Sequence, residues 1–153
     1  MSRFDNYGCD DEHGIPDEFW YQALGRHLNG PQGQANLRRI RAALDALPEK
    51  VLISGTFCDG ERVCAVGALV AYARAREGQT WHQVLAELPW DDDGYLLETV
   101  RQGKLAGLPR TLAEELANLN DEWWGHLTPE QRWERARKWV LDRIIPAPGE
   151  EIR

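Results

Sequence analysis

The sequence has no apolar run long enough to cross a membrane. Its longest apolar stretch, residues 63–73, is far shorter than the roughly 20 residues that a membrane-spanning helix needs. Residues 1–14 are acidic and contain no apolar run, so we expect no secretory signal. The sequence therefore predicts a protein that does not associate with membranes.

Cysteine is scarce. The chain holds three cysteines, which is an odd number: Cys9, Cys58 and Cys64. Without a secretory signal, so few cysteines are typical of reduced thiols in a cytoplasm. We therefore expect a cytoplasmic protein, and we expect no disulfide between Cys58 and Cys64.

Basic charge is low compared with acidic charge. The chain has 18 Lys and Arg against 25 Asp and Glu, which gives a net charge of −7. General affinity for nucleic acid depends on Lys and Arg that displace phosphate counterions, so we expect no direct nucleic-acid binding. The basic cluster of Arg38, Arg39, Arg41 and Lys50 is interpreted as the solvated side of a helix, or as a contact for a partner's acidic patch.

What the chain has is enough apolar material for one folded domain. Its 153 residues include 42% hydrophobic residues and seven tryptophans, and a chain of this size buries most of its apolar surface. We expect residues 1–145 to form a single compact α-rich domain whose first 14 residues are an acidic arm. Residues 146–153 are expected to be a flexible tail.

Helix-start signals and apolar spacings of three and four residues predict six or seven helices. Thr80, Thr111 and Thr128 each stand three residues before a Glu or Gln, which is the capping-box pattern. Three consecutive aspartates, Asp91–Asp93, are placed to cap a further helix. The expected helices cover residues 16–29, 32–47, 64–76, 80–88, a segment after 93, a segment from 111, and 128–145.

Residues 51–57 are the only β-rich stretch. The Asp59-Gly60 pair that follows favours a two-residue type I′ turn, because both central positions of that turn need positive φ. The sequence therefore predicts a hairpin formed by residues 51–57 and 61–63, with Cys64 at the start of the next helix. The expected fold class is mainly α with one short β-hairpin.

Cys64 is the sharpest candidate for chemistry. The pKa of a thiol at a helix N-terminus falls, so Cys64 could be the nucleophile of a thiol-dependent hydrolase with His82 or His126 as base. The competing interpretation is a small apolar side chain that packs beneath the hairpin. We favour packing, because both histidines fall in helical or loop segments, and we therefore expect no catalytic residues.

Metal binding is a second alternative. Cys9, His13, Cys58 and Cys64 are possible soft ligands for zinc. Five residues separate Cys58 from Cys64, whereas paired zinc ligands are more often separated by about two to four. We therefore expect no cofactor and keep a zinc-stabilised binding module as the alternative.

Loop tryptophans beside acidic residues indicate a contact surface. Trp123 and Trp124 are adjacent, so they cannot share one face of a helix or strand, and an exposed Trp is a typical binding anchor. The alternative is that these tryptophans pack over neighbouring loops and that the carboxylates only cap helices. The predicted surface consists of Trp90, Asp91, Asp92, Asp93, Asp121, Glu122, Trp123 and Trp124.

Four segments that span most of the chain carry a resemblance to a known family. They are residues 10–16 (DDEHGIP), residues 33–50, residues 63–69 (VCAVGAL), and Asn120-Asp121 with residues 128–133 (TPEQRW). In these segments the chain resembles a family of uncharacterised proteins of bacteriophages and prophages, which has no established activity to carry over.

The resemblance implies a small accessory protein made inside an infected or lysogenic bacterium. Such proteins often bind a host protein, including host defence complexes. The expected function is therefore a non-enzymatic one: binding to a host bacterial protein, in the manner of an anti-CRISPR protein or of an acidic nucleic-acid mimic.

Overall fold

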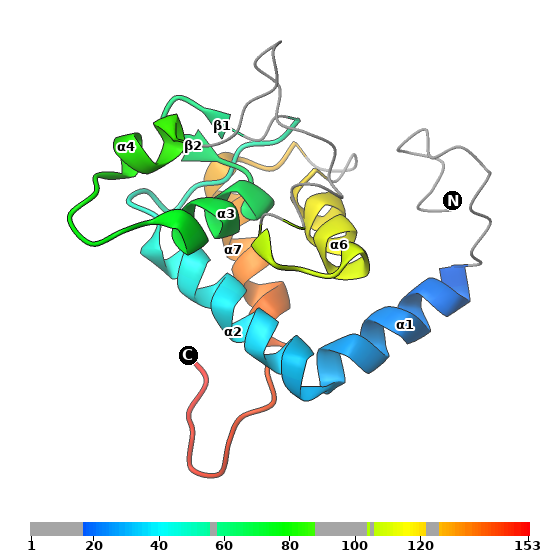
Figure 1. The fold of residues 1–153 in the computed structure, drawn as a ribbon. Helices are drawn as coiled ribbons and strands as arrows, with labels where there is room; N and C mark the ends of the chain where they lie inside the picture. Colours follow the sequence, from blue (N-terminus) through cyan, green and yellow to red (C-terminus); the bar gives the residue numbers. More distant parts are fainter. Residues whose placement is uncertain (1–16, 56–57, 88–103, 105, 122–125) are drawn as a thin grey trace.

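The computed structural model describes residues 17–55, 58–87, 104, 106–121 and 126–153. Within these residues it contains six helices and one two-stranded antiparallel sheet, so the predicted mainly α fold is confirmed (Figure 1). The elements are α1 (Asp17–Asn29), α2 (Pro31–Ala46), β1 (Cys58–Asp59), β2 (Arg62–Val63), α3 (Ala65–Arg74), α4 (Trp81–Ala86), α6 (Arg110–Asn120) and α7 (Pro129–Leu141).

The close approach of the end of α1 to the start of α2 depends on Gly33. Gly30 separates the two helices and Pro31 opens α2, where its missing N–H costs nothing. A Cβ at Gly33 would lie 1.8 Å from the main-chain oxygen of His27. Only glycine allows the end of α1 to approach α2 so closely.

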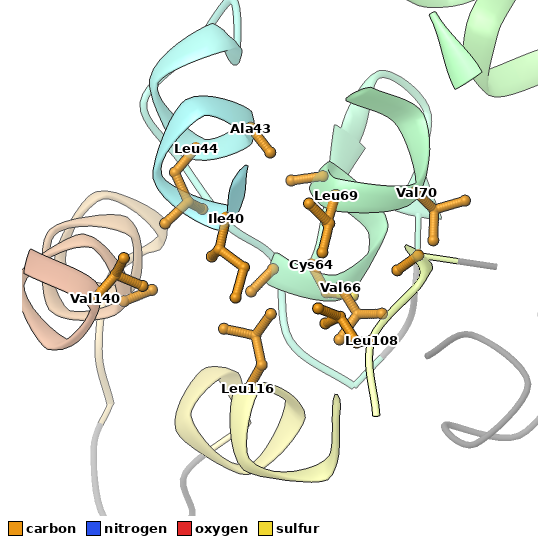
Figure 2. Close-up of a cluster of buried hydrophobic side chains, with 14 of the residues drawn as sticks. Ile40, Ala43, Leu44, Cys64, Val66, Leu69, Val70, Leu108, Leu116 and Val140 are labelled. Atoms are coloured by element: carbon orange, nitrogen blue, oxygen red, sulfur yellow. The ribbon is translucent and has the colours of Figure 1, made fainter. Parts of the chain in front are cut away.

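The core is centred on α3. Seven consecutive residues of this helix, Ala65 to Ala71, are buried, so its first two turns have no solvent-facing side. α2 and α6 both pack against it, and Figure 2 shows side chains from α2, α3, α6 and α7 pointing toward one another. Tyr72 and Ala73, in the last turn of α3, are exposed.

The apolar stripes of the other helices are confirmed. Leu24 and Leu28 of α1 are buried, and Phe19 in the first turn of α1 is 53% exposed. In α2, α6 and α7 the residues at spacings of three and four are the buried ones: Leu37, Ile40, Leu44, Leu112, Leu116, Leu119, Ala136 and Val140.

The hairpin is shorter than predicted and starts later in the chain. β1 is Cys58–Asp59 and β2 is Arg62–Val63, whereas residues 51–55 form no strand. The main chain of residues 51–55 makes one bond to β2 and one to the start of α7 instead of a continuous ladder. The amide of Leu52 donates to the oxygen of Pro129 at 3.0 Å, and that of Ile53 donates to the oxygen of Val63 at 3.1 Å.

The turn also differs from the prediction by one residue. Cys58 pairs with Val63 and Asp59 with Arg62, so the central residues are Gly60 and Glu61 rather than Asp59 and Gly60. Gly60 has φ +61°, and among the described residues only glycines have positive φ. A positive φ at the first central position alone is the feature of a type II′ turn, so the predicted type I′ turn is wrong.

Two of the three predicted capping boxes are confirmed. Thr80 and Thr128 each accept a hydrogen bond from the amide three residues on, and each receives the reciprocal bond from a glutamine side chain. Thr111 does not cap α6. Pro109 holds the extended N-cap position with φ −65° and ψ 152°, so the helix begins one residue before Thr111. None of the helices in the described part of the chain combines the length and apolar character that a membrane span requires.

Candidate interaction surface

Cys64 is a buried cap of α3. Its side chain is 8% exposed, lies among the apolar core residues in Figure 2, and accepts a hydrogen bond from the Gly67 amide at 3.3 Å. Burial raises the pKa of Cys64 to about 12; the Gly67 amide opposes this rise and the charge of Asp121 adds to it. Desolvation therefore outweighs the pKa-lowering effect of the helix N-terminus, and the thiol is neutral near pH 7.

The two histidines considered as bases lie on the surface. His82 and His126 are both exposed, and the Nδ1 of His82 lies 3.6 Å from a carboxylate oxygen of Glu61. A nucleophilic cysteine needs a thiolate and an imidazole within hydrogen-bond reach. A buried neutral thiol and solvent-exposed imidazoles favour the packing interpretation of Cys64.

Asn120, at the end of α6, fastens two distant segments to each other. It is 2% exposed; its amide nitrogen donates to the oxygen of Ile53 at 2.7 Å, and its side-chain oxygen accepts from the amide of Ala65 at 3.0 Å. Asp121 continues this junction by accepting from the amide of Gly55 at 3.1 Å. Asp121 is therefore half-buried with one oxygen engaged, and its role in a contact surface stays a prediction.

A pocket of about 190 Å³ lies beside the hairpin. Its buried lining is apolar and includes Leu47, Val51 and Val63, which are 4%, 8% and 1% exposed. Its exposed lining consists of Pro48 and the charged residues Glu49, Asp59, Glu61 and Arg62. The pocket therefore has an apolar floor and a charged rim.

The rim is acidic on balance. Among the described residues that line the pocket, three carboxylates stand against one guanidinium, that of Arg62. Arg62 lies 3.3 Å from Glu49, and both side chains are more than half exposed, so this ion pair is weak. An apolar floor beneath carboxylates suits a Lys or Arg side chain, whose stem packs on apolar surface while its charged end stays at the rim. We call Glu49, Asp59 and Glu61 with this pocket the acidic hairpin face.

The predicted metal ligands are not assembled in the described part of the chain. The Sγ of Cys58 donates to the oxygen of Gly60 at 3.3 Å, and burial, followed by the charge of Asp59, raises the pKa of Cys58. Among the described residues, no three His, Cys, Asp or Glu side chains are grouped so that they could hold a metal ion. Cys9 and His13 lie outside these residues, so the zinc alternative stays a prediction.

Most of the predicted contact residues lie outside the part of the chain that the structure describes. These are Trp90, Asp91, Asp92, Asp93, Glu122, Trp123 and Trp124. The acidic hairpin face was not predicted, because neither its pocket nor its charge balance follows from the order of residues along the chain.

The basic cluster of α2 is not a fully solvated face. Arg38, Arg39 and Arg41 are all half-buried, and each contacts a segment far away in the sequence. Arg39 donates to the oxygen of Gly107 at 3.0 Å. Arg38 contacts Glu150 and Arg41 contacts Arg153, both within residues 146–153, which were expected to be a flexible tail.

No protein-family model, curated protein or solved structure matches this chain. The fold and the site thus define a small mainly α protein with an acidic surface pocket. The resemblance to bacteriophage and prophage proteins stays a prediction.

Proposed function

We propose that this protein is a non-enzymatic accessory protein of bacteriophage or prophage origin that binds a host bacterial protein. The observation that carries the proposal is the acidic hairpin face, where three carboxylates and one guanidinium line a pocket together with the buried residues Leu47, Val51 and Val63. The resemblance noted in the sequence supplies the phage context, and the pocket supplies a means of binding.

The chemistry of the pocket favours a partner that presents Lys or Arg. A host protein that handles nucleic acid has such a basic surface, since it must neutralise phosphates. The acidic hairpin face would occupy that surface as nucleic acid does, which supports inhibition of a defence complex as the mode of action. Because charge complementarity mainly sets the rate of association and the choice of partner, binding should weaken as salt increases.

The state of Cys64 supports binding rather than thiol chemistry. A pKa of about 12 leaves almost no thiolate at physiological pH, and the sulfur is buried. A thiol-dependent hydrolase would need the opposite shift of the pKa and an open path to the sulfur.

The proposal is tested by comparing how the wild-type chain and a variant with two reversed charges capture a partner. The full chain is immobilised and exposed to a bacterial lysate at low salt, beside the double variant Asp59→Lys with Glu61→Lys. Both side chains are exposed, so the reversal should leave the fold intact. We expect the wild-type chain to retain a stoichiometric protein that the double variant does not retain.

Glu134→Lys is the matched control. Glu134 is an exposed acid on α7 that does not line the pocket, and its reversal changes the net charge in the same direction. Retention by this control, together with loss in the hairpin variant, would support the proposal. Loss in both variants would mean that only net charge matters, and absence of any stoichiometric partner would contradict the proposal.

A further inference from the structure

Residues 145–153 reverse direction after α7, in the turn that Figure 1 shows at the end of the chain, and form a strap that is bonded to α2 and α7. A turn at Pro148-Gly149 produces the reversal. The amide of Glu150 donates to the oxygen of Ala147 at 2.9 Å, and Gly149 has φ +80°. Pro followed by Gly with positive φ is typical of a type II turn, so the local sequence accounts for the reversal.

Glu150 is held by a guanidinium of α2. Arg38 donates to both carboxylate oxygens of Glu150, at 3.2 and 2.8 Å, and to the main-chain oxygen of Ile145 at 3.0 Å. The amide of Ala147 also donates to Glu150 at 2.8 Å. This amide, chiefly, and the charge of Arg38 lower the pKa of Glu150, so the strap presents an ionised carboxylate to the helix.

Two further arginines hold the last residue of the strap. Arg41 of α2 and Arg137 of α7 donate to the main-chain oxygen of Arg153, at 2.7 and 3.1 Å. Between these contacts and Glu150, Ile152 is half-buried and packs against the core. Arg38, Arg41 and Arg137 of α2 and α7 thus bind a side-chain carboxylate and the main-chain oxygen of Arg153, beside one aliphatic side chain; we call these three arginines the arginine face.

The strap is held by contacts that are easily exchanged. Its bonds to Arg38, Arg41 and Arg137 are all solvent-exposed, and Arg38 and Glu150 are 37% and 35% exposed. Exposed ion pairs contribute little to stability, because water and salt compete for both partners. A second peptide with the same groups can therefore compete with the strap for the arginine face.

We propose that the arginine face is a second interaction surface, which takes an acidic peptide segment of another protein, and that residues 145–153 occupy it as a displaceable internal ligand. The matching segment has an acidic residue followed two positions later by an aliphatic one, as Glu150 and Ile152 are. A peptide fits better than nucleic acid, because the strap also contributes the aliphatic side chain of Ile152, which packs against the apolar core.

A labelled peptide with the sequence of residues 146–153 (PAPGEEIR) is a suitable probe, and its binding to the full chain is followed by fluorescence anisotropy. Glu150→Gln weakens the internal ligand, so this variant should bind the probe about two- to fivefold more tightly than the wild type, as loss of an exposed ion pair predicts. Glu151→Gln is the matched control. Glu151 pairs only with Arg153 among the described ion pairs, so this variant should bind the probe as the wild type does.

Adding Arg38→Ala to Glu150→Gln should remove the gain, because Arg38 is the group that the probe's first glutamate would bind. Equal affinity of wild type and Glu150→Gln, or the same gain in Glu151→Gln, would overturn the proposal. Absence of probe binding to Glu150→Gln would overturn it too, as would tighter binding of a single-stranded oligonucleotide of equal charge.

Discussion

Asn120 shows how much of this fold depends on one polar side chain. Its carboxamide joins the end of α6, the irregular segment 51–55 and the first turn of α3 by hydrogen bonds of 2.7 and 3.0 Å. A buried main-chain group that loses its partner costs free energy, because water cannot replace that partner. Asn120 therefore takes the place of the missing strand pairing of residues 51–55.

Replacing Asn120 by alanine should lower the free energy of unfolding by about 1–3 kcal/mol, since the oxygen of Ile53 and the amide of Ala65 both lose their partner. Urea denaturation measures this loss. Asn118→Ala, in the same helix at a half-buried position, is the control and should change stability by no more than about 0.5 kcal/mol. An equal effect in both variants would show that the junction contributes nothing specific.

Cys64 should react slowly with iodoacetamide in the folded protein. Burial raises the pKa of this thiol from 9.0 to about 12, so its thiolate fraction should rise near pH 12 rather than near pH 9. Mass spectrometry of the labelled chain separates Cys64 from Cys58, which is only half-buried and should react first. Urea should make Cys64 as reactive as an ordinary cysteine, whereas rapid labelling of the native chain near pH 6 would restore the hydrolase hypothesis.

At the scale of elements, the helix N-termini are where local sequence decides structure. Thr80 and Thr128 bond only to residues within three positions, so their capping boxes follow from the sequence alone. Thr111 has the same pattern, but Pro109 takes the extended N-cap position and α6 begins at Arg110. Pro109 and Thr111 are N-cap candidates two residues apart, and Pro109 is the N-cap of α6.

This difference between two threonines is measurable. Thr128→Ala should lower the free energy of unfolding by about 1 kcal/mol, because the N-cap of α7 loses its hydrogen bond to the Gln131 amide. Thr111→Ala, which removes no cap, should cost distinctly less. Thermal or urea unfolding of the two variants measures both losses of stability. A larger loss of stability in Thr111→Ala than in Thr128→Ala would contradict the capping of α6 by Pro109.

Local patterns were sufficient for the helices and their buried stripes, and insufficient for the hairpin. Residues 51–55 contain the β-forming residues that predicted a strand, yet their amides bond to Pro129 and Val63. The register of the turn shifted by one residue because pairing between Cys58 and Val63, and not the Asp-Gly pair, positions it. Such long-range partners are invisible to a reading of neighbouring residues.

The candidate site was less predictable than the fold for the same reason. The pocket combines Leu47 and Glu49 at the end of α2 with Asp59 and Glu61 of the hairpin. The strap brings Glu150 onto Arg38, 112 positions away in the sequence. The acidic residues predicted as a contact surface, Asp91, Asp92, Asp93 and Glu122, lie outside the described residues, so their contribution stays a prediction.

For the whole molecule, charge is distributed over two surfaces. Figure 1 shows the hairpin at the top of the molecule and the strap at the bottom, with α2 running between them. The two surfaces approach each other at the end of α2, because Asp45 pairs with Arg41 and Arg137, and Lys50, next to Glu49, donates to the main-chain oxygen of Asp45. A net charge of −7 therefore coexists with a local basic face that its own acidic segment covers. Because Asp59 and Glu61 belong neither to the strap nor to the arginine face, reversing them should leave binding of the PAPGEEIR probe unchanged.

The most direct measurement is the affinity of the captured partner for the acidic hairpin face, determined by titration calorimetry at low and at physiological salt. The account predicts that the double variant Asp59→Lys with Glu61→Lys binds at least about tenfold more weakly than the wild type, since each reversed charge repels the partner's basic surface. It also predicts that salt weakens the wild-type complex and that Glu134→Lys behaves as the wild type does. Unchanged affinity in the double variant would contradict the account.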